Sequence, residues 1–269
     1  MAGTRERRRR LRMDSVNRLL PNALTMLGLC AGLTAMRYGM DGAWHIAVAL
    51  IAVASLMDAL DGRIARLMGG PTEFGGQLDS LTDAISFGVA PVALLYMWSL
   101  NAAGGVGWTI TLLFSVCCVL RLARFNITRD DPDLPGWAGS FFSGVPAPAG
   151  AGLVLLPLVL SLQFQWDFLH APQLTGPWVL IVAALMISRI PTYSFKRLRV
   201  RPGMVRFWMV GIAGFATVLI TEPWATLSAM IIAYGLTIPF SLRSYRRRER
   251  EEADGGGSDA DAEVDGDEC

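Results

Sequence analysis

The chain has 269 residues, of which 52% are hydrophobic and 17% are charged, and its mean hydropathy is +0.40. These values exclude an ordinary soluble domain and indicate a protein embedded in a membrane. The formal net charge of +1 does not suggest a nucleic-acid partner, and the four cysteines show neither a disulfide framework nor a zinc-site spacing.

Long apolar segments alternate with short polar links along most of the chain. They predict an all-α integral membrane protein with about eight transmembrane helices. The segments run approximately over residues 20–36, 43–60, 81–100, 105–122, 148–164, 177–190, 207–221 and 224–241.

The basic residues are distributed unevenly between the links. All except Arg37 lie before the first apolar segment or beside the links after the second, fourth, sixth and eighth. Because positive links stay on the cytoplasmic side, we expect both termini and the link after the second segment to be cytoplasmic. The predicted organisation is a basic cytoplasmic arm (1–18), one membrane domain (19–245) and a disordered acidic tail (246–269).

The first apolar segment opens with the sequence PNALT. Asn22 and Thr25 are one helical turn apart near the predicted cytoplasmic edge. Their polar atoms either cap the start of a helix or face a site between helices.

Four aspartates interrupt the apolar pattern between the second and third segments. Asp58 and Asp61 are spaced i,i+3, and Asp79 and Asp83 are spaced i,i+4, so each pair projects from one face of a helix. The sequence GGPTEFGG (69–76) lies between the pairs and favours a turn. The stretch therefore predicts a helix, a turn and a second helix, with four carboxylates directed towards one place.

Carboxylate oxygens are suitable ligands for Mg²⁺ or Mn²⁺, and two such ions can hold a diphosphate between its attacking and leaving groups. Gly62 and Ala65 permit close approach to the backbone, and Arg66 has the fork geometry for a phosphate. Two alternatives remain open, which are a structural network of ion pairs and the cation path of a divalent-cation transporter.

The spacing of these residues resembles the signature of the CDP-alcohol phosphotransferase family. The pattern D-x2-D-G-x2-A-R-x8-G-x3-D-x3-D is filled at every fixed position, from Asp58 to Asp83. The resemblance implies a homodimeric membrane enzyme in which Asp58, Asp61, Asp79 and Asp83 bind metal. It also implies that Asp83 deprotonates an acceptor hydroxyl, which attacks the β-phosphorus of a CDP-linked donor and expels CMP. Donor binding is expected from a further group of residues: Asn22, Thr25, Gly62, Arg66, Thr72 and Gly75.

Three later segments resemble the bacterial phosphatidylserine synthases of this family. They are RLARFN (121–126), FFSGVPAPAGA (141–151) and SRIPTYSFK (188–196). This resemblance implies that CDP-diacylglycerol is the donor, L-serine the acceptor and the cytoplasmic (inner) membrane the location. Serine carries a carboxylate that needs a cationic partner, so Arg121, Arg124, Asn126 and Ser143 are acceptor-site candidates. The arginines have an alternative role as cytoplasmic anchors, and inositol phosphate or glycerol phosphate are the rival acceptors.

Overall fold

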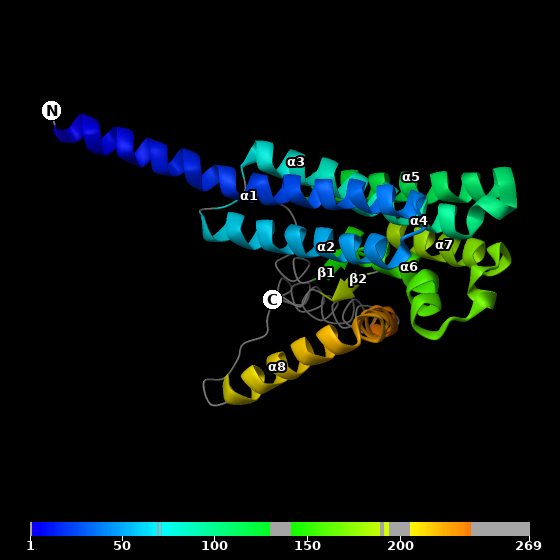
Figure 1. Cartoon of the computed structure of the whole chain (residues 1–269). Coiled ribbons are helices and arrows are strands. Elements are labelled where there is room, and N and C mark those ends of the chain that lie inside the picture. The colour runs from blue at the N-terminus through cyan, green and yellow to red at the C-terminus, as the bar shows by residue number, and fades with distance from the viewer. Residues whose placement is uncertain are drawn as a thin grey trace, which may run out of the picture.

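The computed structural model describes residues 2–68, 70, 72–129, 141–188, 191–193 and 205–237. The described chain is helical apart from one short two-stranded ribbon (Figure 1). Its first half contains α1 (Ala2–Met40), α2 (Trp44–Leu67), α3 (Glu73–Asp83), the π-helix η1 (Ala84–Val89), α4 (Ala90–Trp98), the 3₁₀-helix η2 (Leu100–Ala103) and α5 (Gly104–Arg129).

The second half begins with strand β1 (Phe141–Ser143) and helix α6 (Ala147–Phe164). It continues with the 3₁₀-helix η4 (Asp167–His170), α7 (Pro172–Ile187), strand β2 (Pro191–Tyr193), α8 (Val205–Thr221) and a last helix at Pro223–Thr237. Proline occupies the first turn of α4, α6 and α7, where its missing N–H costs no helical hydrogen bond. The predicted acidic tail lies outside the described residues.

Five of the described helical segments are long and apolar enough to cross a membrane, and they make the protein an all-α membrane protein. They are Leu19–Met40, Trp44–Leu67, Glu73–Trp98, Leu100–Ile127 and Ala147–Phe164. Helix α7 is apolar but shorter, and α8 and the last helix form a pair bent by 120°. Each of the eight predicted segments thus corresponds to a helix over most of its described residues, although fewer than eight pass this test.

The turn between α2 and α3 is shorter than the glycines suggested. Thr72 caps α3 because its side-chain oxygen accepts a hydrogen bond from the Gly75 N–H at 3.0 Å, so the helix starts at Glu73. Gly75 and Gly76, which we expected in the turn, are therefore helical. As a consequence Asp79 and Asp83 lie within the third membrane segment, which we expected to begin at residue 81.

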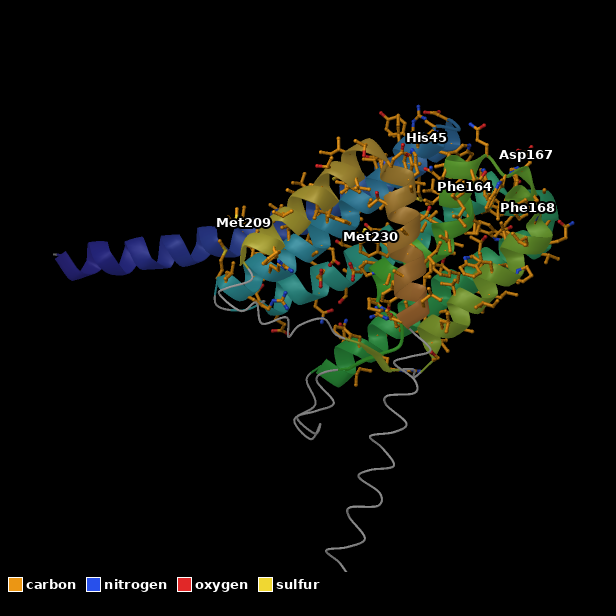
Figure 2. The ribbon with its side chains drawn as sticks, turned by 90° about the horizontal axis from the view of Figure 1, so that it is seen from below. His45, Phe164, Asp167, Phe168, Met209 and Met230 are labelled. Carbon is orange, nitrogen blue, oxygen red and sulfur yellow. The ribbon has the colours of Figure 1, made fainter. Side chains whose placement is uncertain are left out.

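The ends of the helices form two distinct faces of the bundle. The end of α5 contacts α3 through Asn126 and Ser80, and it contacts the end of α7 through Arg124 and Ile187. We call this face the acid end, because α2 ends there and α3 begins there, near the aspartates. Figure 2 shows His45, Phe164, Asp167 and Phe168 gathered at the opposite end of the bundle.

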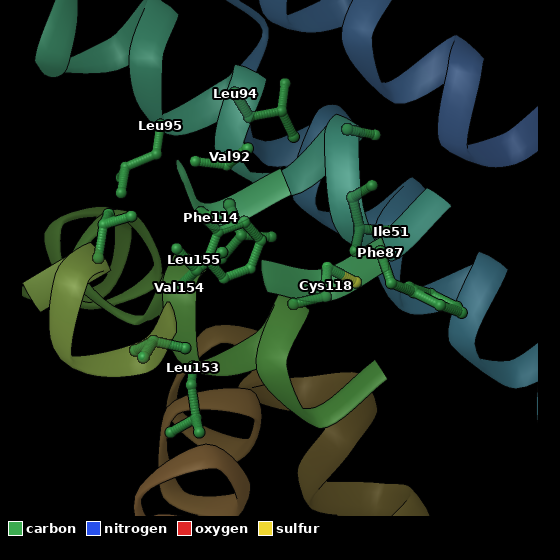
Figure 3. Packing of buried hydrophobic residues seen from close by; sticks show 14 of the residues in the cluster. Ile51, Phe87, Val92, Leu94, Leu95, Phe114, Cys118, Leu153, Val154 and Leu155 are labelled. Carbon is green, nitrogen blue, oxygen red and sulfur yellow. The ribbon is translucent and has the colours of Figure 1, made fainter. Parts of the chain in front are cut away.

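The apolar core lies between these ends and contains side chains from most of the helices. Phe87 of η1 and Phe114 of α5 are its largest fully buried side chains, and leucines and valines of α4 and α6 surround Phe114 (Figure 3). Between membrane helices such side chains stabilise the bundle through close van der Waals packing, because the surrounding lipid is as apolar as the core. The core therefore fixes α4, α5 and α6 around the segment that follows the second pair of aspartates.

The backbone changes from α-helix to π-helix directly after Asp83. Within η1 the carbonyl oxygen of Gly88 accepts a hydrogen bond from Ser115 Oγ of α5 at 3.0 Å. A Cβ atom at Gly88 would lie 3.1 Å from Cys118 Sγ, so α5 approaches the π-helix closely. π-Helical segments are rare and occur frequently at functional sites.

The ribbon joins two segments that are far apart in sequence. β1 and β2 pair in antiparallel fashion, with Phe141 opposite Tyr193 and Ser143 opposite Pro191. Gly144 follows β1 with a φ of +82°, and a Cβ atom there would lie 2.7 Å from the Met186 carbonyl oxygen. Glycine is required at this position, since both the backbone conformation and the contact with α7 exclude a side chain.

Candidate active site

A small cavity at the acid end contains all four aspartates of the signature. The cavity is partly open to the surroundings, and its closed part is much smaller than a typical small-molecule site. Its lining comes from α1, α2, α3 and η1 and consists of Thr25, Gly28, Ala54, Asp58, Asp61, Asp79, Thr82, Asp83, Ser86 and Phe87.

Three of the carboxylates are arranged as a candidate metal site. One oxygen from each of Asp58, Asp61 and Asp79 lies within 4.8 Å of the others. Oxygens that share one Mg²⁺ or Mn²⁺ ion at about 2.0–2.2 Å lie at most about 4.4 Å apart, so a limit of 4.8 Å brings the three carboxylates close to the spacing of a shared divalent ion. The donor set is also appropriate, because hard divalent ions prefer carboxylate oxygens.

Asp61 is held in place by the first helix. It is 5% exposed, and its Oδ2 accepts a hydrogen bond of 2.6 Å from the Thr25 hydroxyl. The same hydroxyl lies 3.0 Å from the carbonyl oxygen of Pro21, but its single proton serves the charged acceptor better. Thr25 therefore lines the cavity and orients a metal-ligand candidate, which matches the second of its two predicted roles.

Asp83 lines the same cavity one turn beyond Asp79 and lies outside the group of three closely spaced carboxylates. The guanidinium of Arg121, on α5, is near enough to interact electrostatically with both Asp83 and Asp58. Arg121 is 7% exposed, and its Nε has no hydrogen-bond partner among the described residues. A buried cation thus faces the buried acids and keeps one donor available.

The remaining donor-site candidates fall into two groups. Asn22, Thr72 and Gly75 meet where α1 passes the start of α3, since a Cβ atom at Gly75 would lie 3.0 Å from both Asn22 Oδ1 and Thr72 Oγ1. The close approach at Gly75 is therefore made by α1 and by the helix cap. Gly62 and Arg66 lie on an exposed face of α2, where no described atom lies within 4 Å of a Cβ added at Gly62.

The structure separates the acceptor-site candidates from one another. Arg121 is buried within electrostatic range of Asp58 and Asp83. Arg124, in contrast, is exposed, and its Nη1 donates to the carbonyl oxygen of Ile187 at 3.0 Å, at the end of α7. Asn126 binds Ser80 through its amide group, with Nδ2 2.9 Å from Ser80 Oγ. The side chain of Ser143 lies outside the described residues, although its backbone belongs to β1.

Three cavity residues of α3 and η1 did not follow from the acidic pattern: Thr82, Ser86 and Phe87. Thr82 stands three residues after Asp79, and Ser86 three residues after Asp83. This i,i+3 spacing was the available signal, because such residues share a helix face. It was concealed by the apolar residues between them, which indicated only a membrane segment.

Comparisons with known proteins agree with this arrangement. Residues 18–241 match the sequence model of the CDP-alcohol phosphatidyltransferase family. The CDP-diacylglycerol–serine O-phosphatidyltransferase of Mycobacterium leprae is 40% identical over 228 residues, which are 85% of this chain and 76% of that protein.

More distant relatives have related names. The Helicobacter pylori (strain 26695) protein named CDP-diacylglycerol–serine O-phosphatidyltransferase is 31% identical over 221 residues, covering 81% of this chain and 90% of the relative. The archaetidylserine synthase of Methanothermobacter thermautotrophicus is 34% identical over 174 residues, 64% of this chain and 68% of that protein. With a family match over most of its length and an aspartate cavity of the expected composition, this chain belongs to the CDP-alcohol phosphatidyltransferase family.

Proposed function

We propose that the protein transfers the phosphatidyl group of CDP-diacylglycerol to the hydroxyl of L-serine, producing phosphatidylserine and CMP. The observation that carries the choice of serine is Arg121, a buried guanidinium within electrostatic range of Asp58 and Asp83 whose Nε has no hydrogen-bond partner among the described residues. A buried cation with an unpaired donor is costly. The carboxylate of an amino acid would pair with its free Nε while the amino acid's hydroxyl reaches the acids.

We assign metal binding and proton transfer to different aspartates. Asp58, Asp61 and Asp79 would hold one or two Mg²⁺ or Mn²⁺ ions, which would neutralise the diphosphate and stabilise the departing CMP. Asp83 would accept the proton of the serine hydroxyl while the oxygen of that hydroxyl forms a bond to the β-phosphorus. Asp83 would also touch a metal, as the family resemblance implies.

The donor would approach along α2 and the start of α3. Arg66 and the open face at Gly62 would receive the nucleotide beside the contact of α1 with α3, which involves Asn22, Thr72 and Gly75. The acyl chains would remain in the bilayer, because Asp58 and Asp61 lie in the last turns of a membrane helix.

We further propose that the acid end faces the cytoplasm in the inner membrane. Helices α2, α5 and α7 end at this face, and basic residues concentrate in the sequence around these three ends. Trp98, Trp166 and Trp224 lie at the ends of helices on the opposite side, as an interfacial aromatic belt would. The proposed topology keeps eight crossings, both termini in the cytoplasm and the three-part organisation at 1–18, 19–245 and 246–269.

The proposed homodimer rests on the family resemblance. Several apolar side chains of α5 are exposed, among them Val116, Val119 and Leu120, and a second copy could cover them. Cross-linking in native membranes, followed by light scattering of the purified protein, would test this. A monomer under both conditions would contradict it.

The activity is tested directly with purified protein in mixed micelles that contain CDP-diacylglycerol and Mg²⁺ or Mn²⁺. Labelled serine, inositol phosphate and glycerol phosphate are supplied one at a time, and lipid product and CMP are both measured. We expect label in lipid with serine alone, and none after chelation of the metal. Labelling with a phosphorylated acceptor and none with serine would contradict the choice of acceptor.

A second measurement distinguishes a divalent-cation transporter from the proposed enzyme. Sealed vesicles containing the protein are given labelled Mn²⁺ with and without CDP-diacylglycerol. Metal uptake without CMP release from any donor would favour transport, whereas CMP release without uptake supports the enzyme.

A further inference from the structure

Thr82 is a buried polar residue of the cavity that the acidic signature does not include. It stands between Asp79 and Asp83 on α3 and is 6% exposed. Its Oγ1 is shut off from solvent and has no hydrogen-bond partner among the described residues. Threonine hydroxyls inside helices usually bind the carbonyl oxygen four residues earlier, so this one departs from the normal arrangement.

The other cavity hydroxyls each have an acceptor, at very different distances. Thr25 donates to Asp61 at 2.6 Å, whereas Ser86 Oγ lies 3.5 Å from the carbonyl oxygen of Gly28, which makes a weak contact at best. The surrounding carboxylates, when ionised, are acceptors that can bind metal but cannot donate a hydrogen bond. Within the part of the chain that the structure describes, Thr82 is therefore the cavity hydroxyl that has no hydrogen-bond partner at all.

An unsatisfied buried hydroxyl destabilises the protein that carries it, so its retention calls for a ligand. A diphosphate presents anionic oxygens and has no donors of its own in this environment. We propose that Thr82 is a substrate-binding residue whose hydroxyl donates to a non-bridging oxygen of the donor's diphosphate. This inference rests on the proposed function for the identity of the ligand.

Two properties of the protein should change in opposite directions when the hydroxyl is removed. Valine has the shape of threonine without the hydroxyl, so Thr82→Val should raise the melting temperature of the metal-free protein by roughly 2–6 °C. The same substitution should lower kcat for CMP release by about 10- to 100-fold, because a hydrogen bond to a charged oxygen is lost. A structural role would lower stability and leave kcat unchanged.

The experiment compares three variants with the unmodified protein. Thr82→Ser keeps the hydroxyl and should retain at least about a third of kcat. Thr111→Val is the matched control, since Thr111 is also buried but its hydroxyl binds the carbonyl oxygen of Gly107 at 2.9 Å on α5. That control should lose stability and keep kcat. Melting curves, kcat, and the dissociation constant for CDP-diacylglycerol in Mg²⁺-containing micelles are measured for each.

The outcomes separate this inference from the proposed function. A Thr82→Val protein with unchanged kcat and unchanged donor affinity would overturn the inference, as would a Thr82→Ser protein as impaired as Thr82→Val. If the unmodified protein released no CMP with serine, the proposed function would fail. Thr82 would then be judged by donor affinity, with weaker binding by Thr82→Val supporting the contact and equal binding refuting it.

Discussion

Buried polar residues lie at both ends of the bundle, but only those at the end opposite the aspartates find all their hydrogen-bond partners within the protein. At the opposite end, Ser99 and Thr175 are at most 1% exposed. Their hydroxyl oxygens are 2.8 Å apart, and Ser99 Oγ also donates to the carbonyl oxygen of His170 at 2.8 Å. This cluster joins η2, η4 and α7 and has no need of a ligand.

At the acid end, in contrast, some buried polar side chains lack hydrogen-bond partners within the described part of the chain. Asp58 is near the acids Asp61 and Asp79 and is balanced in part by Arg121, while the Thr82 hydroxyl has no partner among the described residues. Like charges held together in a membrane protein are unfavourable unless something binds between them. Burial of polar side chains alone therefore does not identify a functional site. Buried polar side chains that lack hydrogen-bond or ion-pair partners within the protein do.

The largest expected effect concerns the proposed base. Asp83→Asn should reduce CMP release by about 10²- to 10⁴-fold, because the amide cannot accept the proton. Donor binding should persist in part, since the three closely spaced carboxylates remain. Turnover and binding of CDP-diacylglycerol are measured on the same preparation, and a near-normal kcat would show that another group is the base.

A second test separates two arginines of the same helix. Arg121→Met should raise KM for serine by about 10- to 100-fold, as expected for losing a charge-assisted hydrogen bond. Arg124→Met is the matched variant, because its Nη1 contacts the carbonyl oxygen of Ile187. It should lower the melting temperature and change KM by less than about 3-fold. Equal KM values for both variants would remove Arg121 from the acceptor site.

A third test addresses the ribbon at the acid end. Gly144→Ala should destabilise the protein by about 1–3 kcal/mol, or roughly 2–10 °C in melting temperature. The added Cβ would meet the carbonyl oxygens of Met186 and Ser188 at 2.7 and 2.9 Å. Gly104→Ala provides the control, since Gly104 also has positive φ but no described atom lies within 4 Å of its Cβ position. Similar losses in both would mean that strain alone, and not the contact with α7, matters at Gly144.

The smallest expected effect is at the satisfied cluster. Thr175→Val should cost about 1 kcal/mol, or roughly 2–4 °C in melting temperature, because Ser99 loses a partner. Both KM values and kcat should remain unchanged. A kinetic defect without loss of stability would contradict the purely structural role of this cluster, and with it the distinction between the two ends of the bundle.

The family signature and the helical segments were readable from residue order because both depend on local spacing. Apolar runs must form helices in a bilayer, where every backbone polar group needs a partner. The i,i+3 and i,i+4 intervals then placed Asp58 with Asp61 and Asp79 with Asp83 on common helix faces, as the structure confirms. The length of the turn was wrong, because the cap formed by Thr72 outweighs the low helix propensity of two glycines.

Tertiary structure decided which candidates meet. Spacing treated Arg121 and Arg124 as equivalent, since they are one turn apart, yet packing of α5 turns the first towards the acids and the second towards the end of α7. Asn126 was attached to Ser80 in the same way. The sequence by itself therefore determined the class of chemistry, because metal ligands are specified by residue type and short intervals. The partners of each polar side chain were decided by helix packing, which depends on contacts between residues far apart in the chain.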